Sequence, residues 1–446
     1  MTRDIRKTLD ESPMTPFQWF AVTICVMLVM LDGFDVLVMA FTASGISAEW
    51  KLNGAELGFL FSAGLVGMAA GSLFLAPLAD RWGRQAVILI CLVVITIGMG
   101  LSALSRSSVE LGLLRAFTGV GIGGMLASVG VITAEFASDK WRSTAVGLQA
   151  TGYPIGATIG GIIAAVLLEH YGWRSVFAFG SLATALMIPV VLWRLPESLD
   201  FLMTRQPAKA LPKVNALLRR MNQPALAQLP ARGARAKTSG SSIAGLFAPN
   251  LRASTLCLWG AFFLLMFSFY FALSWTPKLL VSAGLSAKEG VTGGVLLNVG
   301  GIVGGSVFGL LAARVALRPL TAVSLVLTAV AVATFGLYTH ELSMAFMVAG
   351  AIGAFIFASM AGLYAFAPVV YPASVRTTGL GWAIGIGRLG AVLGPLVAGM
   401  LLDSGWPAPH LYYIYALPLL AAAASVMALG QQVGAGPGAR IAAAAH

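Results

Sequence analysis

Charged residues are scarce in this chain of 446 residues. They make up 10% of it, against about 25% in an ordinary soluble domain. Hydrophobic residues make up 58%, and the mean hydropathy is +0.87. This balance excludes a water-soluble enzyme. The 52 glycines and 20 prolines are scattered inside long apolar runs, so they indicate membrane helices rather than disorder or collagen.

Cysteine and histidine are also rare. The three cysteines lie inside apolar segments, where free cysteine behaves as a small hydrophobe, and they form no disulfide or metal motif: Cys25, Cys91 and Cys257. The four histidines lie outside or at the ends of the apolar segments: His170, His340, His410 and His446. No phosphate-cradling loop or nucleophile elbow is present either. We therefore expect no metal, no cofactor, no enzymatic activity and no histidine proton relay.

The net charge of +11 does not indicate nucleic-acid binding. The basic residues fall in short loops between apolar segments and form no basic stripe. The first apolar run lacks a small-residue cleavage site, so we expect the first helix to be retained rather than removed as a signal peptide. The positive charge is therefore interpreted as a membrane-topology signal.

Twelve apolar stretches are long enough to cross a membrane, since a membrane helix needs roughly 20 mainly apolar residues. They begin near Phe17, Ala55, Ala86, Val109, Thr144, Ser175, Ala253, Gly290, Leu320, Ser343, Thr377 and Leu411. An even number of spans puts both ends of the chain on one side. The sequence therefore predicts an all-α membrane protein.

Lysine and arginine are divided unevenly between the two sides of this predicted membrane. The side opposite to the termini has only Lys51, Arg106, Arg174, Lys278 and Lys288. Because positively charged loops stay in the cytoplasm, we predict that both termini are cytoplasmic. The predicted order is a cytoplasmic segment (1–16), a six-helix bundle (17–195), a basic cytoplasmic linker (196–252), a second six-helix bundle (253–431) and a cytoplasmic tail (432–446).

The two halves repeat each other. RSTAVGLQATGYPIGATIGG, which starts at Arg142, overlies RTTGLGWAIGIGRLGAVLGP, which starts at Arg376. The identities include Gly147/Gly381, Gly156/Gly390 and Gly160/Gly394. Small residues at such positions let helices approach closely, and parallel halves of this kind are a transporter architecture. Similar composition of glycine-rich helices is the alternative explanation.

The loop after the second span, GSLFLAPLADRWGRQ, is the most specific string in the chain. It places Asp80, Arg81, Gly83 and Arg84 at the cytoplasmic edge of the membrane. We expect the aspartate to cap the next helix and the arginines to pair with carboxylates on a neighbour, which makes a gate that breaks and re-forms. A pair of topology arginines in a tight turn is the alternative, but it requires neither the aspartate nor the glycine.

Three further residues are assigned to this gate. Glu135 lies close in depth to the loop, and Arg142 lies at the same membrane edge, with Arg376 as its equivalent in the second half. A snorkelling surface carboxylate is the alternative reading of Glu135.

These strings resemble the major facilitator superfamily, whose signature loop lies between spans two and three and whose twelve spans form two bundles. Within it, LDGFD (31–35), SWTPKLL (274–280) and YPASVRTTGLGWAIGIGR (371–388) resemble the aromatic acid:proton symporter family. Val369 and Val370 stand where relatives often have a glutamate. The resemblance implies a multi-pass protein of the bacterial inner membrane that takes hydroxylated benzoates such as 4-hydroxybenzoate, protocatechuate or vanillate.

Asp32 and Asp35 are costly residues for a membrane span, by roughly 2.5 to 3.5 kcal/mol each at its centre. They are three residues apart and share a helix face. If span one ends near Phe41, Asp35 lies about 9 Å from its outer end, at about the depth of Arg115 in span four. A cation near two buried carboxylates favours ionisation of one and protonation of the other, which makes a proton site. A static ion pair is the alternative.

Arg388 lies about 18 Å into span eleven, near the membrane midplane. In the repeat alignment it occupies the position of Pro154. A buried arginine without a protein carboxylate can hold a substrate carboxylate by two parallel hydrogen bonds. Pairing with Asp32 or Asp35 is the alternative.

Aromatic residues predicted near this depth could stack on a substrate ring: Tyr153, Phe267, Tyr270, Tyr364, Phe366 and Trp382. Asn298 in span eight could meet a ring hydroxyl. Helix packing is the alternative role for each of these residues.

The sequence thus predicts proton-coupled uptake of a small aromatic carboxylate by alternating access. Expected partners are this substrate, protons and the lipid bilayer, with no nucleic acid and no obligate protein partner. Three alternatives stay open: a symporter of a non-aromatic acid such as muconate, shikimate or a sugar acid, a proton-driven exporter, and a sensor or scaffold without transport.

Overall fold

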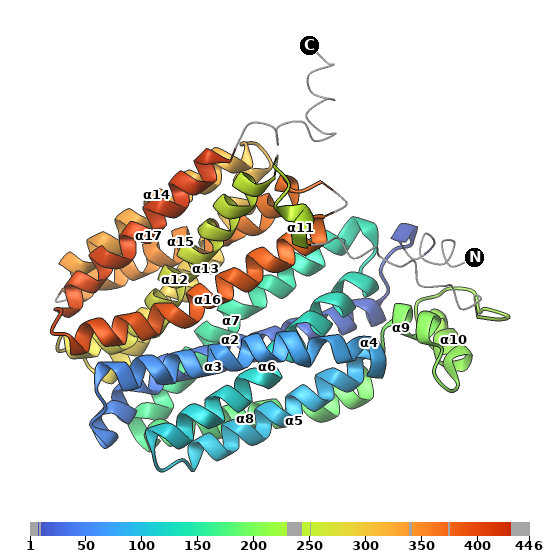
Figure 1. Cartoon of the computed structure of the whole chain (residues 1–446). Coiled ribbons are helices and arrows are strands. Elements are labelled where there is room, and N and C mark those ends of the chain that lie inside the picture. Colours follow the sequence, from blue (N-terminus) through green and yellow to red (C-terminus); the bar gives the residue numbers. More distant parts are fainter. Residues whose placement is uncertain are drawn as a thin grey trace. The chain divides into compact units, whose positions relative to one another are not determined.

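The computed structural model describes residues 8, 10–229, 243–249, 251–338, 341–372 and 375–429 (Figure 1). Over these ranges the chain is helical and has no strand. Twelve of the helices are long and apolar enough to cross a membrane, which confirms the predicted fold class of a multi-pass, all-α membrane protein. The predicted tail (432–446), His340, His446 and linker residues 230–242 lie outside the described ranges.

The helices fall into two sets of six spans. The first set is α2 (Pro16–Trp50), α3 (Gly54–Phe74) with η1 (Ala76–Leu78) and α4 (Ala79–Trp82), α5 (Arg84–Ala103), α6 (Ser108–Phe136), α7 (Asp139–Tyr171) and α8 (Trp173–Arg194). The second set is α12 (Arg252–Ser282), α13 (Ala287–Ala312), α14 (Leu317–Leu337), α15 (Leu342–Val370), α16 (Arg376–Asp403) and α17 (Ala408–Ala428). Between the sets lie the short helices α9 (Leu199–Arg205), α10 (Ala210–Arg220) and α11 (Ile243–Leu246).

Two spans are longer than the sequence predicted. Helix α2 continues past Phe41 to Trp50, and α7 starts at Asp139 rather than Thr144. Hydropathy marks only the apolar part of a helix, whereas the hydrogen-bonded backbone continues for as long as no residue stops it. About 22 Å of helix therefore follows Asp35, rather than the predicted 9 Å or so.

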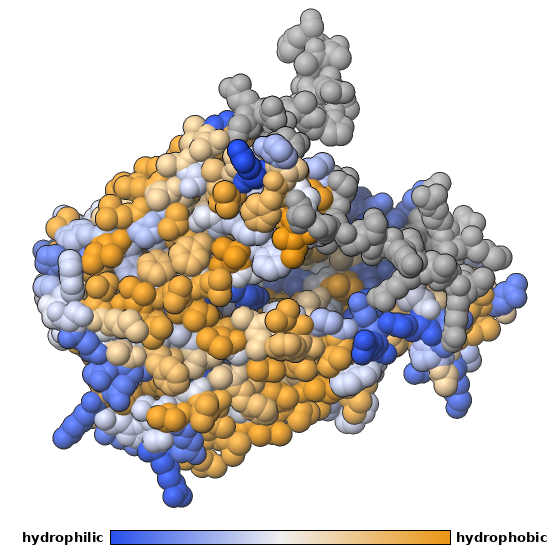
Figure 2. Space-filling model, viewed as in Figure 1, coloured by the Kyte–Doolittle hydropathy of each residue, from blue (hydrophilic) through white to orange (hydrophobic). Residues whose placement is uncertain are grey.

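Large apolar side chains cover the outer faces of the spans. Figure 2 shows them as broad orange areas over the helices, with hydrophilic residues collected near the helix ends. Leu73, Leu113, Leu186 and Leu310 each expose more than half of their surface. Soluble proteins rarely expose such continuous apolar areas, so these faces are suited to contact with lipid.

The described chain forms two compact units. Unit 1 comprises Met1–Ile46 and Ala63–Lys237, and unit 2 comprises Ser47–Ser62 and Thr238–His446. Helix α3 is divided between them, because its first residues belong to unit 2 and the rest to unit 1.

In unit 1, α7 packs against α2 through glycines. A Cβ atom added at Gly156 would collide with the backbone of Met30, and one at Gly160 would collide with the ring of Phe34. Only glycine allows the two helices to approach this closely.

Unit 2 repeats this arrangement between α12 and α16. A Cβ atom at Gly390 or Gly394 would collide with the backbone of Phe263 or Phe267, respectively. In the sequence repeat, Gly390 is equivalent to Gly156 and Gly394 is equivalent to Gly160. The sequence repeat therefore corresponds to the same helix packing in both units.

Candidate functional site

The two aspartates of α2 lie in the core of unit 1. Asp32 is 2% exposed and Asp35 is 1% exposed. Gly33, between them, contacts the backbone carbonyl of Tyr153 on α7 so closely that a Cβ atom would not fit. The aspartates are thus held where α2 crosses α7, away from water.

Arg115 of α6 reaches the same place and is 2% exposed. Its guanidinium donates to the backbone carbonyl of Asp35 (2.6 Å) and to the thioether of Met99 (3.2 Å). Its charge also acts on the Asp35 carboxyl group, which in turn interacts electrostatically with Asp32. The structure therefore brings the three charged residues of the predicted proton site together.

The carboxyl group of Asp35 is not saturated with hydrogen bonds. Its Oδ1 atom is buried and has no hydrogen-bond partner among the described residues. A buried oxygen of this kind is costly as part of a charged carboxylate and less so in a protonated acid. The arrangement can therefore accept and release a proton.

Arg388 lies half-buried on α16 in unit 2. Its charge acts on the hydroxyl group of Tyr364 on α15. The Tyr364 ring meets the edge of Phe262 on α12, with 5.4 Å between ring centroids. No ion pair joins Arg388 to a carboxylate in the described part of the chain, so its guanidinium can receive one.

The α16 surface next to Arg388 has free space. A Cβ atom added at Gly381 or Gly385 would meet no atom within 4 Å. Trp382 is 42% exposed and stacks on Trp259 at 5.8 Å between centroids. The Trp382 and Trp259 rings thus form a stacked pair between α16 and α12.

The remaining predicted substrate residues are spread more widely. Asn298 is fully buried in α13; its Nδ2 donates to the carbonyl of Gly294 (2.9 Å), while its Oδ1 has no hydrogen-bond partner among the described residues. Tyr270 packs edge-on to Phe269 at 5.3 Å. Tyr153 belongs to unit 1, whereas the other predicted substrate residues belong to unit 2.

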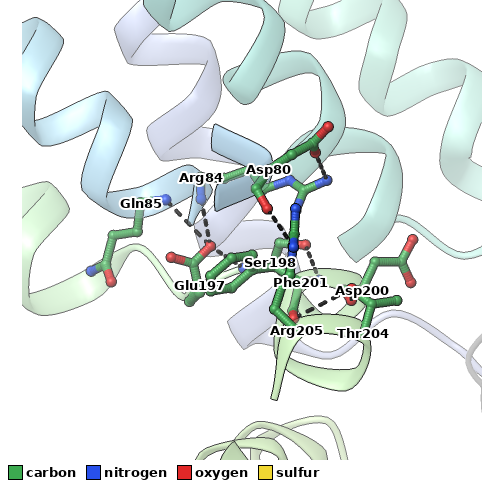
Figure 3. Close-up of polar contacts among 9 residues, drawn as sticks. All are labelled: Asp80, Arg84, Gln85, Glu197, Ser198, Asp200, Phe201, Thr204 and Arg205. Atoms are coloured by element: carbon green, nitrogen blue, oxygen red, sulfur yellow. Dashed lines mark hydrogen bonds and ion pairs between the residues drawn. The ribbon is translucent and has the colours of Figure 1, made fainter. Parts of the chain in front are cut away.

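At the helix end next to α4, two of the predicted gate residues, Asp80 and Arg84, belong to a polar cluster (Figure 3). Asp80 pairs with Arg84 (3.0 Å), and the side chain of Arg205 from α9 donates to the backbone carbonyl of Asp80 (2.8 Å). The first two amides of α5 donate to another carboxylate, Glu197, where the sequence predicted Asp80. All of these contacts lie within unit 1.

Glu197 caps α5 instead, which the sequence reasoning missed. Its Oε1 accepts hydrogen bonds from the backbone N–H groups of Arg84 (2.8 Å), Gln85 (3.4 Å) and Ser198 (2.8 Å). Burial raises the pKa of the Glu197 carboxyl group, although these three hydrogen bonds and the Arg84 charge oppose the shift. The available signal was a carboxylate in the string PESLDFL (196–202), directly after the sixth span.

Gly83 is required by both its backbone and its neighbour. Its φ of +102° is unfavourable for residues with a side chain, and a Cβ atom there would collide with the Glu197 carboxylate. The glycine of the signature loop therefore makes room for the acid that caps the next helix.

The other predicted gate residues have separate partners. Arg142 pairs with Asp139 and Asp10, and it also donates to the carbonyl of Ala134 (3.2 Å). Arg376 donates to the carbonyl of Tyr371 (3.4 Å). Glu135 is half-buried and Arg81 is exposed. The pairs Arg84–Asp80 and Arg142–Asp139 join residues only three or four positions apart, whereas the expected pairs were with carboxylates on a neighbouring helix.

Comparisons with known proteins agree with this architecture. Residues 22–338 match the sequence profile of the Major Facilitator Superfamily. The xylose transporter XylE from E. coli, in a partially occluded inward-open conformation, has a similar fold, with a TM-score of 0.72 at 16% identity over 92% of this chain and 98% of XylE.

Two relatives are similar over nearly their whole length. The gallate transporter of Pseudomonas putida is 33% identical over 428 residues, which cover 96% of this chain and 95% of that protein. The 4-hydroxybenzoate transporter PcaK of Pseudomonas aeruginosa is 29% identical over 436 residues, which cover 96% of each. The chain is therefore a transporter and not an enzyme, and it belongs to the aromatic acid transporters of the major facilitator superfamily.

Proposed function

We propose that this protein takes up a hydroxylated benzoate together with protons across the bacterial inner membrane. The names of its relatives, which include a gallate transporter and a 4-hydroxybenzoate transporter, support this substrate class. The excess of lysine and arginine in the loops on the side of the termini supports cytoplasmic termini.

Arg388 is the proposed receptor for the substrate carboxylate. The observation that carries this assignment is a half-buried guanidinium in a membrane span, beside Tyr364 and Phe262, that forms no ion pair within the described ranges. A planar guanidinium holds a carboxylate by two parallel hydrogen bonds, and the two rings beside it offer apolar surface to a benzoate ring. For Arg388, a static ion pair with Asp32 or Asp35 is thus the less favoured role.

The Asp32 and Asp35 pair is the proposed proton site. Both side chains are buried, they repel each other when charged, and only Arg115 among the described residues supplies a counter-charge beside Asp35. One bound proton removes the repulsion between the two carboxylates. Loss of that proton on the cytoplasmic side would then reset the site for another cycle.

The number of protons decides the driving force. One proton with one monoanionic substrate makes an electroneutral step, which the pH gradient alone drives. A second proton adds the membrane potential, about 2.3 kcal/mol per charge at 100 mV.

The direct test is external pH in lightly buffered proteoliposomes after addition of 4-hydroxybenzoate or gallate. The parent should alkalinise the medium, whereas Asp32→Asn, Asp35→Asn and Arg388→Ala should not. Loss of a buried charge partner costs at least about 2 kcal/mol, so Arg388→Ala should lower the initial rate by roughly thirtyfold or more. Arg314→Ala, an exposed arginine of the same unit, is the matched control and should keep the parent rate.

Two outcomes would contradict the proposal. No pH response of the parent across gallate, 4-hydroxybenzoate, protocatechuate and vanillate would exclude aromatic symport and favour a non-aromatic acid. Substrate efflux from loaded vesicles should acidify the medium, because a symporter run in reverse carries protons out with the substrate. Alkalinisation of the medium during efflux would instead favour a proton-driven exporter.

A further inference from the structure

Met99 lies on α5 where this helix meets α6 and α8 of unit 1, and its side chain is fully buried. It stands between two glycines that make close contacts. A Cβ atom added at Gly98 would collide with the side chain of Thr118 on α6, and one at Gly100 would lie 3.0 Å from Oγ of Ser181 on α8. These small residues let both neighbouring helices approach the Met99 side chain.

The sulfur of Met99 is one of two acceptors for the Arg115 guanidinium. Nη1 donates to Sδ of Met99 (3.2 Å), and Nη2 donates to the backbone carbonyl of Asp35 (2.6 Å). The ring of Phe177 on α8 lies 6.0 Å from the guanidinium carbon. A thioether is only a weak acceptor, and neither acceptor is charged. The buried cation is therefore held by neutral groups.

The side chains of Arg115 and Asp35 both keep unused hydrogen-bonding capacity. Nε of Arg115 and Oδ1 of Asp35 are buried, and neither has a hydrogen-bond partner among the described residues. The two side chains interact electrostatically, but no hydrogen bond joins them within the described ranges. A guanidinium and a carboxylate commonly form two parallel hydrogen bonds, so the contact to Met99 takes the place of a stronger one.

Gly180 on α8 makes room for the other end of Met99. A Cβ atom added there would collide with Cε of Met99, and it would lie 2.9 Å from the ring of Phe34 and 3.5 Å from Oδ1 of Asp35. The methyl group of Met99 thus occupies the space that a side chain at position 180 would take. The thioether is fixed at both ends, by Gly180 at its methyl group and by Arg115 at its sulfur.

Few charged groups face this point. Asp32 of α2 and Arg115 of α6 act on Asp35. From α7, Tyr153 contacts Gly33 through its backbone. The helices α3, α5, α7 and α8 carry their charged residues only in their first or last turn. Because Met99 has no charge of its own, a change there acts on Asp35 through Arg115.

We propose that Met99 is a positioning residue that keeps Arg115 away from the Asp35 carboxyl group and leaves this group free to bind a proton. This inference rests on the proposed function for the role of Asp35 as a proton site. The sulfur and a charged Asp35 carboxylate compete for the same guanidinium. The contact to Met99 is compatible with a protonated Asp35, whereas a direct ion pair favours the charged form. Met99 thus strengthens proton binding.

The substitution Met99→Leu tests this role, because it removes the sulfur and keeps an apolar side chain of similar volume. The guanidinium then loses one acceptor and turns to the Asp35 carboxylate. The pH at which half of the Asp35 groups are protonated should fall by roughly 0.3 to 1 unit, a two- to tenfold loss of proton affinity, as for one hydrogen bond. Met125→Leu is the matched control and should leave this midpoint unchanged. Met125 lies on α6, is 1% exposed and forms no hydrogen bond within the described ranges.

The midpoint is measured by infrared difference spectroscopy of the protein in liposomes, without substrate and without a proton gradient. Protonated carboxyl groups give a separate band, and the part of it that Asp35→Asn removes belongs to Asp35. A band that Asp35→Asn leaves intact would overturn both the proton site and the role of Met99. An unchanged or higher midpoint in Met99→Leu would overturn the role of Met99 alone.

A second substitution separates chemistry from packing. Gly180→Ala displaces the methyl group of Met99 and should lower both the midpoint and the melting temperature. In the double variant with Met99→Leu, the colliding Cε atom is gone, so the melting temperature should recover toward the parent value. The midpoint should nevertheless stay at that of Met99→Leu, because the sulfur is still missing. A midpoint that recovers together with the melting temperature would show a packing effect and would overturn the proposal.

Discussion

At the scale of single residues, Gly83 joins backbone geometry to a side-chain contact. Its φ of +102° and ψ of 153° lie in a region that is essentially limited to glycine. Gly172, before α8, has similar angles (75° and 177°) but has nothing within 4 Å of an added Cβ atom. Alanine substitutions at the two positions can therefore be compared: both add backbone strain, but only the one at Gly83 also adds a collision with Glu197.

We predict that Gly83→Ala destabilises the protein more than Gly172→Ala does. Gly172→Ala should cost about 1 to 3 kcal/mol from backbone strain alone. Gly83→Ala adds a collision with the Glu197 carboxylate, which costs roughly 1 to 3 kcal/mol more. Thermal unfolding of both variants in detergent measures the difference, and equal melting temperatures would show that Glu197 is not held there.

Residue-level chemistry was only partly predictable from the sequence. The sequence indicated that Asp35 and Arg115 lie at similar depth, because charged residues within apolar spans are conspicuous. It did not indicate Glu197 as the cap of α5, because a carboxylate in a loop follows no periodic pattern that would place it beside a helix more than a hundred residues earlier.

At the scale of helices, glycine position decides which faces meet. Gly156 of α7 and Gly390 of α16 are equivalent in the repeat, and both contact the backbone of a neighbouring helix. Gly147 and Gly381 are also equivalent, and neither meets any atom within 4 Å. The repeat thus contains two pairs of packing glycines, Gly156/Gly390 and Gly160/Gly394, and a pair with free space, Gly147/Gly381.

These two pairs make a matched prediction. Gly156→Ala and Gly390→Ala should each destabilise the protein by about 1 to 3 kcal/mol, because the helices must move apart. Gly147→Ala and Gly381→Ala should be neutral or slightly stabilising, since alanine favours a helix over glycine by up to about 1 kcal/mol. Melting temperatures in one detergent compare all four variants. Similar losses in all four would contradict the packing explanation, because helix propensity alone predicts a gain at Gly147 and Gly381.

At the scale of the whole molecule, charge predicts which side of the membrane each loop occupies. Ser282 ends α12 on the predicted outer side, and Ala208 precedes α10 in the basic linker on the predicted inner side. Both side chains are exposed. They therefore report orientation without disturbing a packed contact.

We predict that an impermeant maleimide labels Ser282→Cys in intact cells and labels Ala208→Cys only after the cells are permeabilised. Both variants are made in the chain without other cysteines. The reason is that loops rich in lysine and arginine remain in the cytoplasm. The reverse pattern would place the termini outside.

The sequence by itself determined the twelve spans, the repeat and the family, because these depend on properties of neighbouring residues: the cost of placing each stretch in lipid, the helical period and short motifs. It ended the first span too early, at Phe41, because hydropathy ends with the apolar residues whereas α2 continues to Trp50.

The tertiary structure alone decided which distant groups meet. Glu197 caps α5, Asp403 caps α3, and α3 is divided between two units after Ser62. The physical reason is that such contacts join residues more than a hundred or three hundred positions apart. No local preference specifies them, and only the packing of whole helices brings their atoms within hydrogen-bond distance.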